Sequence, residues 1–313
     1  MANYLITGGA GFIGSHIADR LIREGHAVRI LDDLSSGSKD NLKQVWNKIE
    51  FVNGCISDMD TAYQATKDMD YVLHQAALRS VPKSVDCPME FNKINIEGTL
   101  NLLIASRDNK VGKFAFASSS SVYGNTNKFP QKETERPQPV SPYAITKITG
   151  EYYCKSFSGI YDFNTVSIRY FNVFGPRQSL ENQYAVVIPK FISCILNNEQ
   201  PPIHGDGKQS RDFTYVDNVV DGILTACNKT IKKGEVYNIA CGQEHSLLDL
   251  VYEINKILHT DIQPRFLGLR PGDVPRTLAD ISKAEKQLHW KPIVDFHEGL
   301  EKTVTWFKEH RIS

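Results

Sequence analysis

Short apolar runs alternate with helical patterns along the first half of the chain. Six of these runs are predicted strands: Tyr4–Ile6, Val28–Leu31, Glu50–Val52, Tyr71–His74, Phe114–Ala117 and Val166–Tyr170. Apolar residues spaced three and four apart predict helices over three segments: Phe12–Glu24, Asn95–Asn109 and Tyr143–Tyr161. Strands that alternate with helices are typical of right-handed βαβ units. The pattern therefore predicts an α/β fold with a doubly wound parallel sheet.

The alternation loosens after Gly175, where loops rich in proline and glycine separate shorter elements. We expect a first domain at 1–174 and a smaller C-terminal α/β lobe at 175–313. One late apolar run, Glu235–Ala240, is expected to return to the main sheet. No stretch between the two parts is long enough to act as a linker between independent domains.

Composition narrows the class of protein. The chain of 313 residues is 41% hydrophobic, which is enough for a sizeable core, and its 36 Lys and Arg balance its 36 Asp and Glu. This neutral balance gives no support to a nucleic-acid partner. The most apolar stretch, 185–196, is interrupted by Pro189, Lys190 and Ser193, so we expect no membrane span.

The cysteines bear on the compartment. All six are scattered without a C-x-x-C pair, and no spacing of histidine and cysteine typical of a metal site appears. We therefore expect reduced, mostly buried thiols, no bound metal and a cytoplasmic protein. Strand-like sequence begins at Tyr4, so we expect no signal peptide.

A glycine-rich turn, Thr7–Gly14, lies between the first predicted strand and the first predicted helix. Gly8, Gly11 and Gly14 let backbone amides approach a pyrophosphate at the start of that helix. Asp32 ends the second strand, where a carboxylate accepts hydrogen bonds from an adenosine ribose diol and repels a 2′-phosphate. A structural turn beside a surface aspartate is the alternative. The order of strand, glycines, helix and acid favours binding of NAD over NADP.

A second acidic residue is a candidate for the adenosine end of the cofactor. Asp58 follows the third predicted strand, and we expect its carboxylate to reach the adenine amino group. An ordinary loop acid has the same spacing, so this role stays open.

The segment Ser141–Lys147 carries the candidate chemistry. Ser141 is suited to cap a helix and Pro142 to its first position. Tyr143 and Lys147 are then four residues apart and project from one helix face. A free tyrosine has a pKa of about 10, and a shift of about three units would make its phenol a working base. Lys147 and the positive nicotinamide of bound NAD are the charges available to produce that shift.

Ser119 follows the strand Phe114–Ala117, at the edge of the sheet where a cofactor crevice is expected. Its hydroxyl can share hydrogen bonds with a substrate hydroxyl and with the phenol of Tyr143. The alternative is that the serines of this run only satisfy backbone groups of a turn.

Together these motifs resemble a known family. The segments that carry the resemblance are Thr7–Gly14, Ala117–Gly124, Tyr143–Lys147, Arg169–Gly175, Arg270–Val274 and Ala279–Ser282. They are similar to the extended short-chain dehydrogenase/reductase superfamily, and most of all to its UDP-glucose and UDP-N-acetylglucosamine 4-epimerases. The resemblance implies an NAD-binding Rossmann domain at 1–174 and a UDP-sugar-binding lobe at 175–313. It also implies a homodimer that forms a four-helix contact through the helices at Asn95–Asn109 and Tyr143–Tyr161.

The resemblance further implies which residues bind each ligand. The catalytic residues would be Ser119, Tyr143 and Lys147. NAD would contact Gly8, Gly11, Phe12, Ile13, Gly14, Asp32, Asp33, Leu34, Ser35, Ser36, Gly37, Asp58, Gln75, Ala76, Ala77, Leu78, Arg79, Asn95, Tyr143, Lys147 and Phe171. The UDP-sugar would contact Ser119, Ser120, Tyr143, Asn172, Val186, Val187, Arg211, Arg270, Asp273 and Thr277. Among these, the arginines would grip the diphosphate, because their forked donors match phosphate oxygens.

The implied reaction is inversion of C4 of a UDP-hexose through a 4-keto sugar. In relatives, a tyrosine at the position of Thr277 blocks an N-acetyl group. Because threonine is smaller, we expect activity on UDP-N-acetylglucosamine and UDP-N-acetylgalactosamine. The pair UDP-glucose and UDP-galactose is expected beside them. Arg79 keeps a UDP-glucuronate 4-epimerase or decarboxylase open as an alternative. Ser120 and Ser121 replace the acid pair of 4,6-dehydratases, and retention of Ser119, Tyr143 and Lys147 argues against a binding protein without catalysis.

One departure from the family pattern lies near the expected adenine site. Cys55 stands where relatives usually carry an aspartate.

Overall fold

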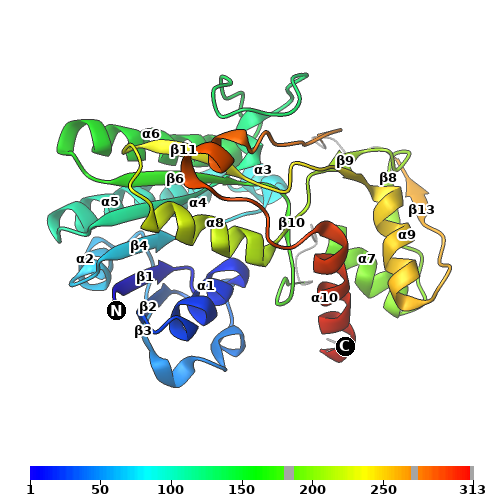
Figure 1. Cartoon of the computed structure of the whole chain (residues 1–313), viewed down its shortest axis with the longest axis horizontal. Coiled ribbons are helices and arrows are strands. Elements are labelled where there is room, and N and C mark those ends of the chain that lie inside the picture. Colours follow the sequence, from blue (N-terminus) through cyan, green and yellow to red (C-terminus); the bar gives the residue numbers. More distant parts are fainter. Residues whose placement is uncertain (180–186, 269–273, 311–313) are drawn as a thin grey trace.

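The computed structural model describes residues 1–179, 187–268 and 274–310. Its main element is a seven-stranded sheet in the order β11-β6-β5-β4-β1-β2-β3, with every pair of neighbours parallel (Figure 1). The strands are β1 (Asn3–Thr7), β2 (Ala27–Asp32), β3 (Ile49–Asn53), β4 (Tyr71–His74), β5 (Lys113–Ser119), β6 (Thr165–Tyr170) and β11 (Glu235–Ile239). The predicted α/β fold with a doubly wound parallel sheet is confirmed.

The order of the strands reverses at β1, which lies between β2 and β4. Thr7, the last residue of β1, is level with Leu31 of β2 and with His74 of β4. In doubly wound sheets, ligands bind beyond the carboxyl ends of the strands at such a reversal. The fold therefore places the loops after β1, β2 and β4 around one crevice.

Helices cover both faces of this sheet (Figure 1). On one face α5 (Gly98–Asp108) packs between α2 (Met59–Thr66) and α6 (Pro142–Tyr161). On the other face α1 (Phe12–Arg23) packs against α8 (Val216–Asn228). A separate apolar core lies on each side, because alternate residues of a strand point to opposite faces.

Three short helical segments precede α5 along the chain. They are α3 (Val81–Asp86), α4 (Pro88–Phe91) and a π-helical turn at Asn92–Glu97. The turn leads directly into α5, so the predicted helix over Asn95–Asn109 begins with widened, π-helical geometry. Such turns occur often at functional sites.

The smaller lobe lies at one end of the molecule, to the right in Figure 1. Its helices are α7 (Val187–Leu196), α9 (Leu247–Leu258) and α10 (Phe296–Glu309). Three strand pairs accompany them: β7 (Val173–Phe174) with β10 (Thr214–Tyr215), β9 (Ser210–Arg211) with β12 (His245–Ser246), and β8 (Pro202–His204) with β13 (Arg265–Leu267). The chain returns twice to the main sheet, once as α8 and once as β11, which pairs with β6.

Several sequence expectations concern features of the whole chain. Within the described residues, no helix is long and apolar enough to cross a membrane. The same residues contain no group of three or more histidine, cysteine, aspartate or glutamate side chains that could hold a metal ion. All six cysteines are free; Cys154, Cys194 and Cys227 are buried, whereas Cys87 is exposed.

Candidate active site

A cavity of ≈ 580 Å³ opens at the carboxyl ends of the sheet strands. Loops after β1, β2, β4, β5 and β6 all contribute to its wall, as expected for a doubly wound sheet. Of the residues predicted for the cofactor, the lining contains Gly8, Gly11, Phe12, Ile13, Gly14, Asp32, Asp33, Ser35, Ser36, Gln75, Ala76, Ala77, Leu78, Arg79, Tyr143 and Lys147. Of those predicted for the substrate, it also contains Ser119, Ser120, Asn172, Arg211 and Thr277.

The remaining predicted residues do not line this cavity. Leu34, Gly37, Asp58, Asn95, Phe171 and Val187 are absent from the described lining. Val186, Arg270 and Asp273 lie outside the described residues.

The glycine turn has the geometry that a bound diphosphate requires. Gly8 has a φ of +66°, and a Cβ there would lie 2.7 Å from the backbone nitrogen of Ala76. A Cβ at Gly14 would collide with the carbonyl oxygen of Gly8. Gly11 is the N-cap of α1, and no described side chain caps that end of the helix. The unsatisfied N–H groups of the first turn therefore form an anion site in the cavity wall.

Asp32 connects two loops at the adenosine end of the cavity. Its Oδ2 accepts a hydrogen bond from the backbone N–H of Ala10 at 2.9 Å, and its Oδ1 accepts one from Leu34 at 2.8 Å. Burial raises the pKa of this carboxyl, and the two backbone donors oppose that rise. These bonds leave further lone pairs on both oxygens for a ribose diol.

The adenine contact of Asp58 stays a prediction, and its side chain is absent from the described lining of the cavity. Its side chain is exposed and caps α2, where Oδ2 accepts a hydrogen bond from the backbone N–H of Thr61 at 3.2 Å. Gly54 and Ile56 line the cavity instead. The sequence argument favoured a carboxylate and overlooked this apolar surface, although both residues directly follow the third strand.

Two other residues predicted to contact NAD lie behind the wall of the cavity. Asn95 lies in the π-helical turn, and its side chain bonds both the N–H and the C=O of Leu78, at 2.8 and 2.9 Å. Asn95 therefore shapes the loop after β4. Phe171 is fully buried beside Tyr123, whereas its neighbour Tyr170 lines the cavity. The residue expected to contact NAD was Phe171, and the structure places the preceding side chain in the wall of the cavity instead.

The segment Ser141–Lys147 forms the start of α6 as predicted. The hydroxyl of Ser141 accepts a hydrogen bond from the N–H of Ala144, and Pro142 occupies the first turn. Nζ of Lys147 donates to the carbonyl oxygen of Ala117 at 2.8 Å. The same nitrogen lies 5.8 Å from the centre of the Tyr143 ring.

Ser119 meets Tyr143 across the cavity. Its Oγ accepts a hydrogen bond from the N–H of Ser121 at 3.1 Å, which leaves its own proton to donate. That hydroxyl lies near the phenol and lowers the pKa of Tyr143. The structure thus brings together the three predicted catalytic side chains, from the end of β5 and the first two turns of α6.

The expected depression of the phenol pKa relied on Lys147 together with the nicotinamide of bound NAD, and the protein's residues alone do not produce it. Burial raises the pKa of Tyr143 above its ordinary value, and the Ser119 hydroxyl and the Arg79 charge only partly oppose it. Burial also lowers the pKa of Lys147 to about 7, so the buried ammonium is itself disfavoured. The positive nicotinamide of bound NAD is a further charge that would lower the pKa of Tyr143.

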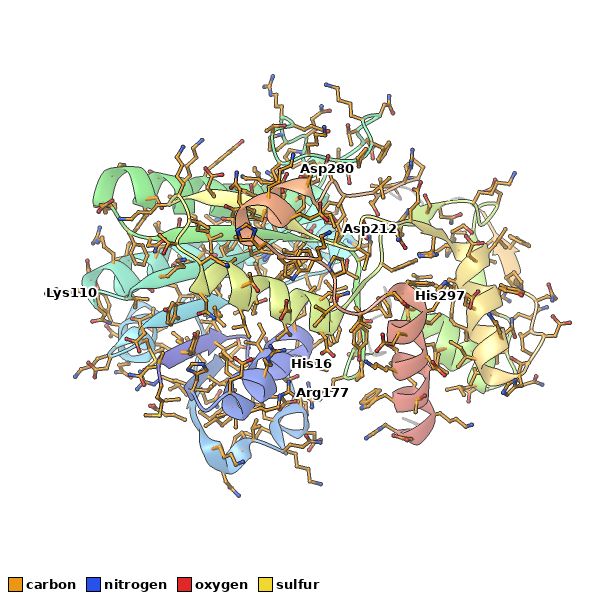
Figure 2. The ribbon with its side chains drawn as sticks, viewed as in Figure 1. His16, Lys110, Arg177, Asp212, Asp280 and His297 are labelled. Atoms are coloured by element: carbon orange, nitrogen blue, oxygen red, sulfur yellow. The ribbon has the colours of Figure 1, made fainter. Side chains whose placement is uncertain are left out.

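Asp212 holds together a second wall of the cavity, at the junction of the main body and the smaller lobe (Figure 2). Its carboxylate accepts hydrogen bonds from the backbone N–H groups of Cys241, Gly242 and Ala279. Burial raises the pKa of Asp212 to about 7. Its backbone carbonyl accepts a hydrogen bond from Asn172, at 3.0 Å.

These contacts bring together residues distant in the chain. Arg211, next to Asp212, has its Nη1 2.8 Å from the carbonyl oxygen of Ser210. The N–H of Asp212 bonds the carbonyl oxygen of Thr277 at 2.9 Å. Three residues predicted for the UDP-sugar, Asn172, Arg211 and Thr277, therefore line one wall.

The glycine turn, Asp32 and the Ser119–Tyr143–Lys147 group agree with a sequence comparison. The profile of the NAD dependent epimerase/dehydratase family matches residues 4–240. The chain belongs to this family. NAD is its cofactor, and the uncapped end of α1 beside the glycine turn fits that dinucleotide.

Close members of the family are similar over their whole length. A putative UDP-glucose 4-epimerase of Methanocaldococcus jannaschii is 41% identical, with 98% of each chain covered. The structure of a UDP-N-acetylglucosamine 4-epimerase from Methanobrevibacter ruminantium, in complex with UDP-N-acetylmuramic acid, is 44% identical, with a TM-score of 0.95 and 99% of each chain covered.

A third member was solved with a cofactor and an acidic sugar nucleotide. The UDP-glucuronic acid 4-epimerase of Bacillus cereus, in complex with UDP-glucuronic acid and NAD, is 32% identical, with a TM-score of 0.91. The match covers 98% of this chain and 99% of that one. The family therefore includes 4-epimerases that differ in the sugar they accept.

Proposed function

We propose that this protein is an NAD-dependent epimerase that inverts C4 of UDP-N-acetylglucosamine and UDP-N-acetylgalactosamine, and of UDP-glucose and UDP-galactose. The observation that carries the proposal is that Ser119, Tyr143 and Lys147 line one cavity, with Lys147 one turn beyond Tyr143 along α6. All three side chains lie in the cavity that the glycine turn and Asp32 also line. A base for a sugar hydroxyl thus lies beside a dinucleotide site.

The protein's own residues handle the proton of the sugar O4. Tyr143 removes this proton, and the hydroxyl of Ser119 stabilises the phenolate by donating to it. Lys147 is anchored by the carbonyl of Ala117, so its ammonium stays beside the phenol. Bound NAD would supply the acceptor and donor of the C4 hydride, so that C4 is inverted when the flat 4-keto sugar presents its other face.

The acetylated pair is favoured by the side chain at position 277. Thr277 lines the cavity, and its hydroxyl accepts a hydrogen bond from Asn172, so the side chain is held in one orientation. A threonine in this position leaves room that a tyrosine ring would fill. The 44% identity to a UDP-N-acetylglucosamine 4-epimerase supports the same choice.

A UDP-glucuronate 4-epimerase or decarboxylase is the second candidate, and Arg79 favours it. This arginine lines the cavity near Tyr143, and no carboxylate pairs with it in the described part of the chain. A guanidinium in that position can pair with the carboxylate of an acidic sugar. The Bacillus cereus relative named for UDP-glucuronic acid shows that the family contains such enzymes.

A direct assay separates the candidates. Purified protein is incubated with UDP-N-acetylglucosamine, UDP-glucose and UDP-glucuronate in separate reactions, and the sugars are identified after acid hydrolysis. We expect the 4-epimers of the first two. Conversion of UDP-glucuronate alone would favour the second candidate, and turnover of none of the three would refute both.

We also propose that two copies pair through α5 and α6, with the neighbouring α3 and α4 extending the contact. Ile145 and Tyr152 on α6 are 49% and 59% exposed, and Val85 on α3 and Met89 on α4 are 63% and 79% exposed. Apolar side chains so exposed on adjacent helices are typical of an interface. A second copy of the chain, related by a twofold axis, would cover them and form the four-helix contact.

A further inference from the structure

A buried ion pair lies directly behind the catalytic serine. The side chains of Glu151 on α6 and Arg169 on β6 are each 3% exposed. Nε of Arg169 donates to one carboxylate oxygen at 2.9 Å, and Nη2 donates to the other at 2.8 Å. The hydroxyl of Ser118, next to Ser119, also donates to Glu151.

Glu151 extends a series of contacts made by α6. Tyr143, Lys147 and Glu151 are spaced four apart and so lie on one face of the helix. Lys147 bonds the carbonyl oxygen of Ala117, and Glu151 bonds the hydroxyl of Ser118. Successive residues at the end of β5 are therefore tied to successive turns of the helix that carries the phenol.

Arg169 contacts the far end of the segment Ser118–Tyr123, which we call the serine turn. Its guanidinium carbon lies 4.7 Å from the centre of the Tyr123 ring, within the range of a cation–π contact. Tyr123 ends the short helical turn Ser120–Tyr123, and its hydroxyl donates to Asn238 at 2.7 Å. The pair thus restrains the segment around Ser119 from both sides.

Stability alone does not account for this ion pair. A buried pair must be stripped of water, and apolar side chains of similar volume often stabilise a fold as well or better. Nη1 of Arg169 is buried and finds no hydrogen-bond partner among the described residues. Burying the two charges costs desolvation free energy. The contacts of the pair are made with Ser118 and Tyr123, at the two ends of the serine turn.

We propose that Glu151 and Arg169 are positioning residues that hold the Ser119 hydroxyl in place beside Tyr143. The inference rests on the proposed function, because it assigns the two residues an effect on the proton transfer by Tyr143. Neither residue is among the described residues that line the cavity. Their loss is expected to lower kcat and to leave the affinity for the UDP-sugar nearly unchanged.

The test replaces both charges together. In Glu151→Met/Arg169→Met no buried charge is left alone, so the fold can persist, which circular dichroism and bound NAD verify. We expect kcat to fall at least tenfold, KM to stay within threefold, and the rise of kcat with pH to move to higher pH, since Ser119 no longer lowers the phenol pKa. A kcat within twofold of the unmodified protein would overturn the inference. The ion pair of Arg29 and Glu50 provides the control, because Arg29→Met/Glu50→Met lies away from Ser119 and should leave kcat unchanged.

A milder variant covers the case in which the double variant does not fold. Ser118→Ala removes the hydroxyl that donates a hydrogen bond to Glu151, and it keeps the ion pair. We therefore expect a fall of a few-fold in kcat with KM unchanged. Unaltered kcat would contradict the inference.

Crystal structures of the folded variants give a readout that does not depend on turnover. We expect the Ser119 hydroxyl to lie further from the phenol oxygen of Tyr143 than in the unmodified protein, and an unmoved Ser119 would contradict the inference. An unmodified protein without turnover refutes the proposed function, whereas an active unmodified protein with equally active variants refutes only the positioning role.

Discussion

Nδ2 of Asn172 donates a hydrogen bond of 2.9 Å to the hydroxyl of Thr277, which lies 105 residues further along the chain. Asn172 lies two residues beyond the last residue of β6, and its φ of 32° is rare for a residue other than glycine. The bond therefore fixes the Thr277 side chain in the cavity wall, where it can bear on the choice of sugar.

We expect Thr277→Tyr to remove activity on the acetylated pair and to spare UDP-glucose and UDP-galactose. The ring would occupy the space that an acetamido group needs. The ratio of the kcat/KM values for UDP-N-acetylglucosamine and UDP-glucose measures the effect, and we expect it to fall at least tenfold. Thr277→Val is the control, since it removes the hydrogen bond and keeps the size. Equal losses on both pairs in the tyrosine variant would show that the position does not select the sugar.

Asp32 and Asp58 are expected to differ in their effect on the cofactor. Loss of a hydrogen bond to a charged group costs about 1.5–3 kcal/mol, so Asp32→Asn should weaken NAD binding by at least about tenfold. Asp58→Asn should leave the affinity unchanged, because asparagine caps α2 as well as aspartate. Calorimetric titration of NAD into the nucleotide-free proteins measures both. The assignment of the ribose to Asp32 fails if its variant binds NAD normally.

His74 is expected to make the fold sensitive to acid. Thr7 bonds its Nδ1 at 2.7 Å, and Thr99 bonds its Nε2 at 2.9 Å. Since the Thr99 hydroxyl donates to the carbonyl of Asn95, Nε2 carries the proton and the ring is neutral. Burial lowers the pKa of His74 to about 3, and the nearby Lys147 charge adds to this.

The unfolded chain therefore binds a proton at His74 more readily than the native protein does. The stability that neutral His74 contributes is fully present above pH 6.5. It is lost as the pH falls toward 3, by up to about 5 kcal/mol. Urea unfolding at a series of pH values should show a shallower loss in His74→Gln. His259→Gln, at an exposed site, should behave like the unmodified protein. Parallel pH profiles for all three proteins would contradict the assignment.

The proposed dimer is tested by one charge on α6. Tyr152→Glu places a carboxylate in the middle of the proposed contact, so light scattering after gel filtration should report a monomer where the unmodified protein is a dimer. Tyr252, on α9, is 65% exposed and serves as the control. Tyr252→Glu should remain a dimer. An unmodified protein that is monomeric at all concentrations would rule out the contact.

Much of the site could be predicted because its chemistry depends on local spacing. The helix start at Ser141 and Pro142 and the four-residue separation of Tyr143 and Lys147 need no tertiary information. Asp58 shows the limit of this approach. Its carboxylate has a competing local partner at the start of α2, and only the folded chain reveals which contact it makes.

Glu151 and Arg169 could not be found in the same way. They lie on α6 and β6 with no motif that connects them, and their relation to Ser118 follows from packing of the helix on the sheet. The rise in the phenol pKa depends likewise on burial, which residue spacing does not report.

The central claim is a redox-neutral inversion at C4, and an isotope at that carbon tests it most directly. UDP-N-acetylglucosamine and UDP-glucose, each with deuterium at C4, are incubated with purified protein without added NAD. We predict that the 4-epimers appear with the deuterium retained at C4, and that Tyr143→Phe slows their formation by about 10²- to 10⁴-fold, the usual contribution of an acid–base group. Tyr252→Phe should react normally. Absence of both epimers, or epimers that have exchanged the label for solvent hydrogen, would contradict the account.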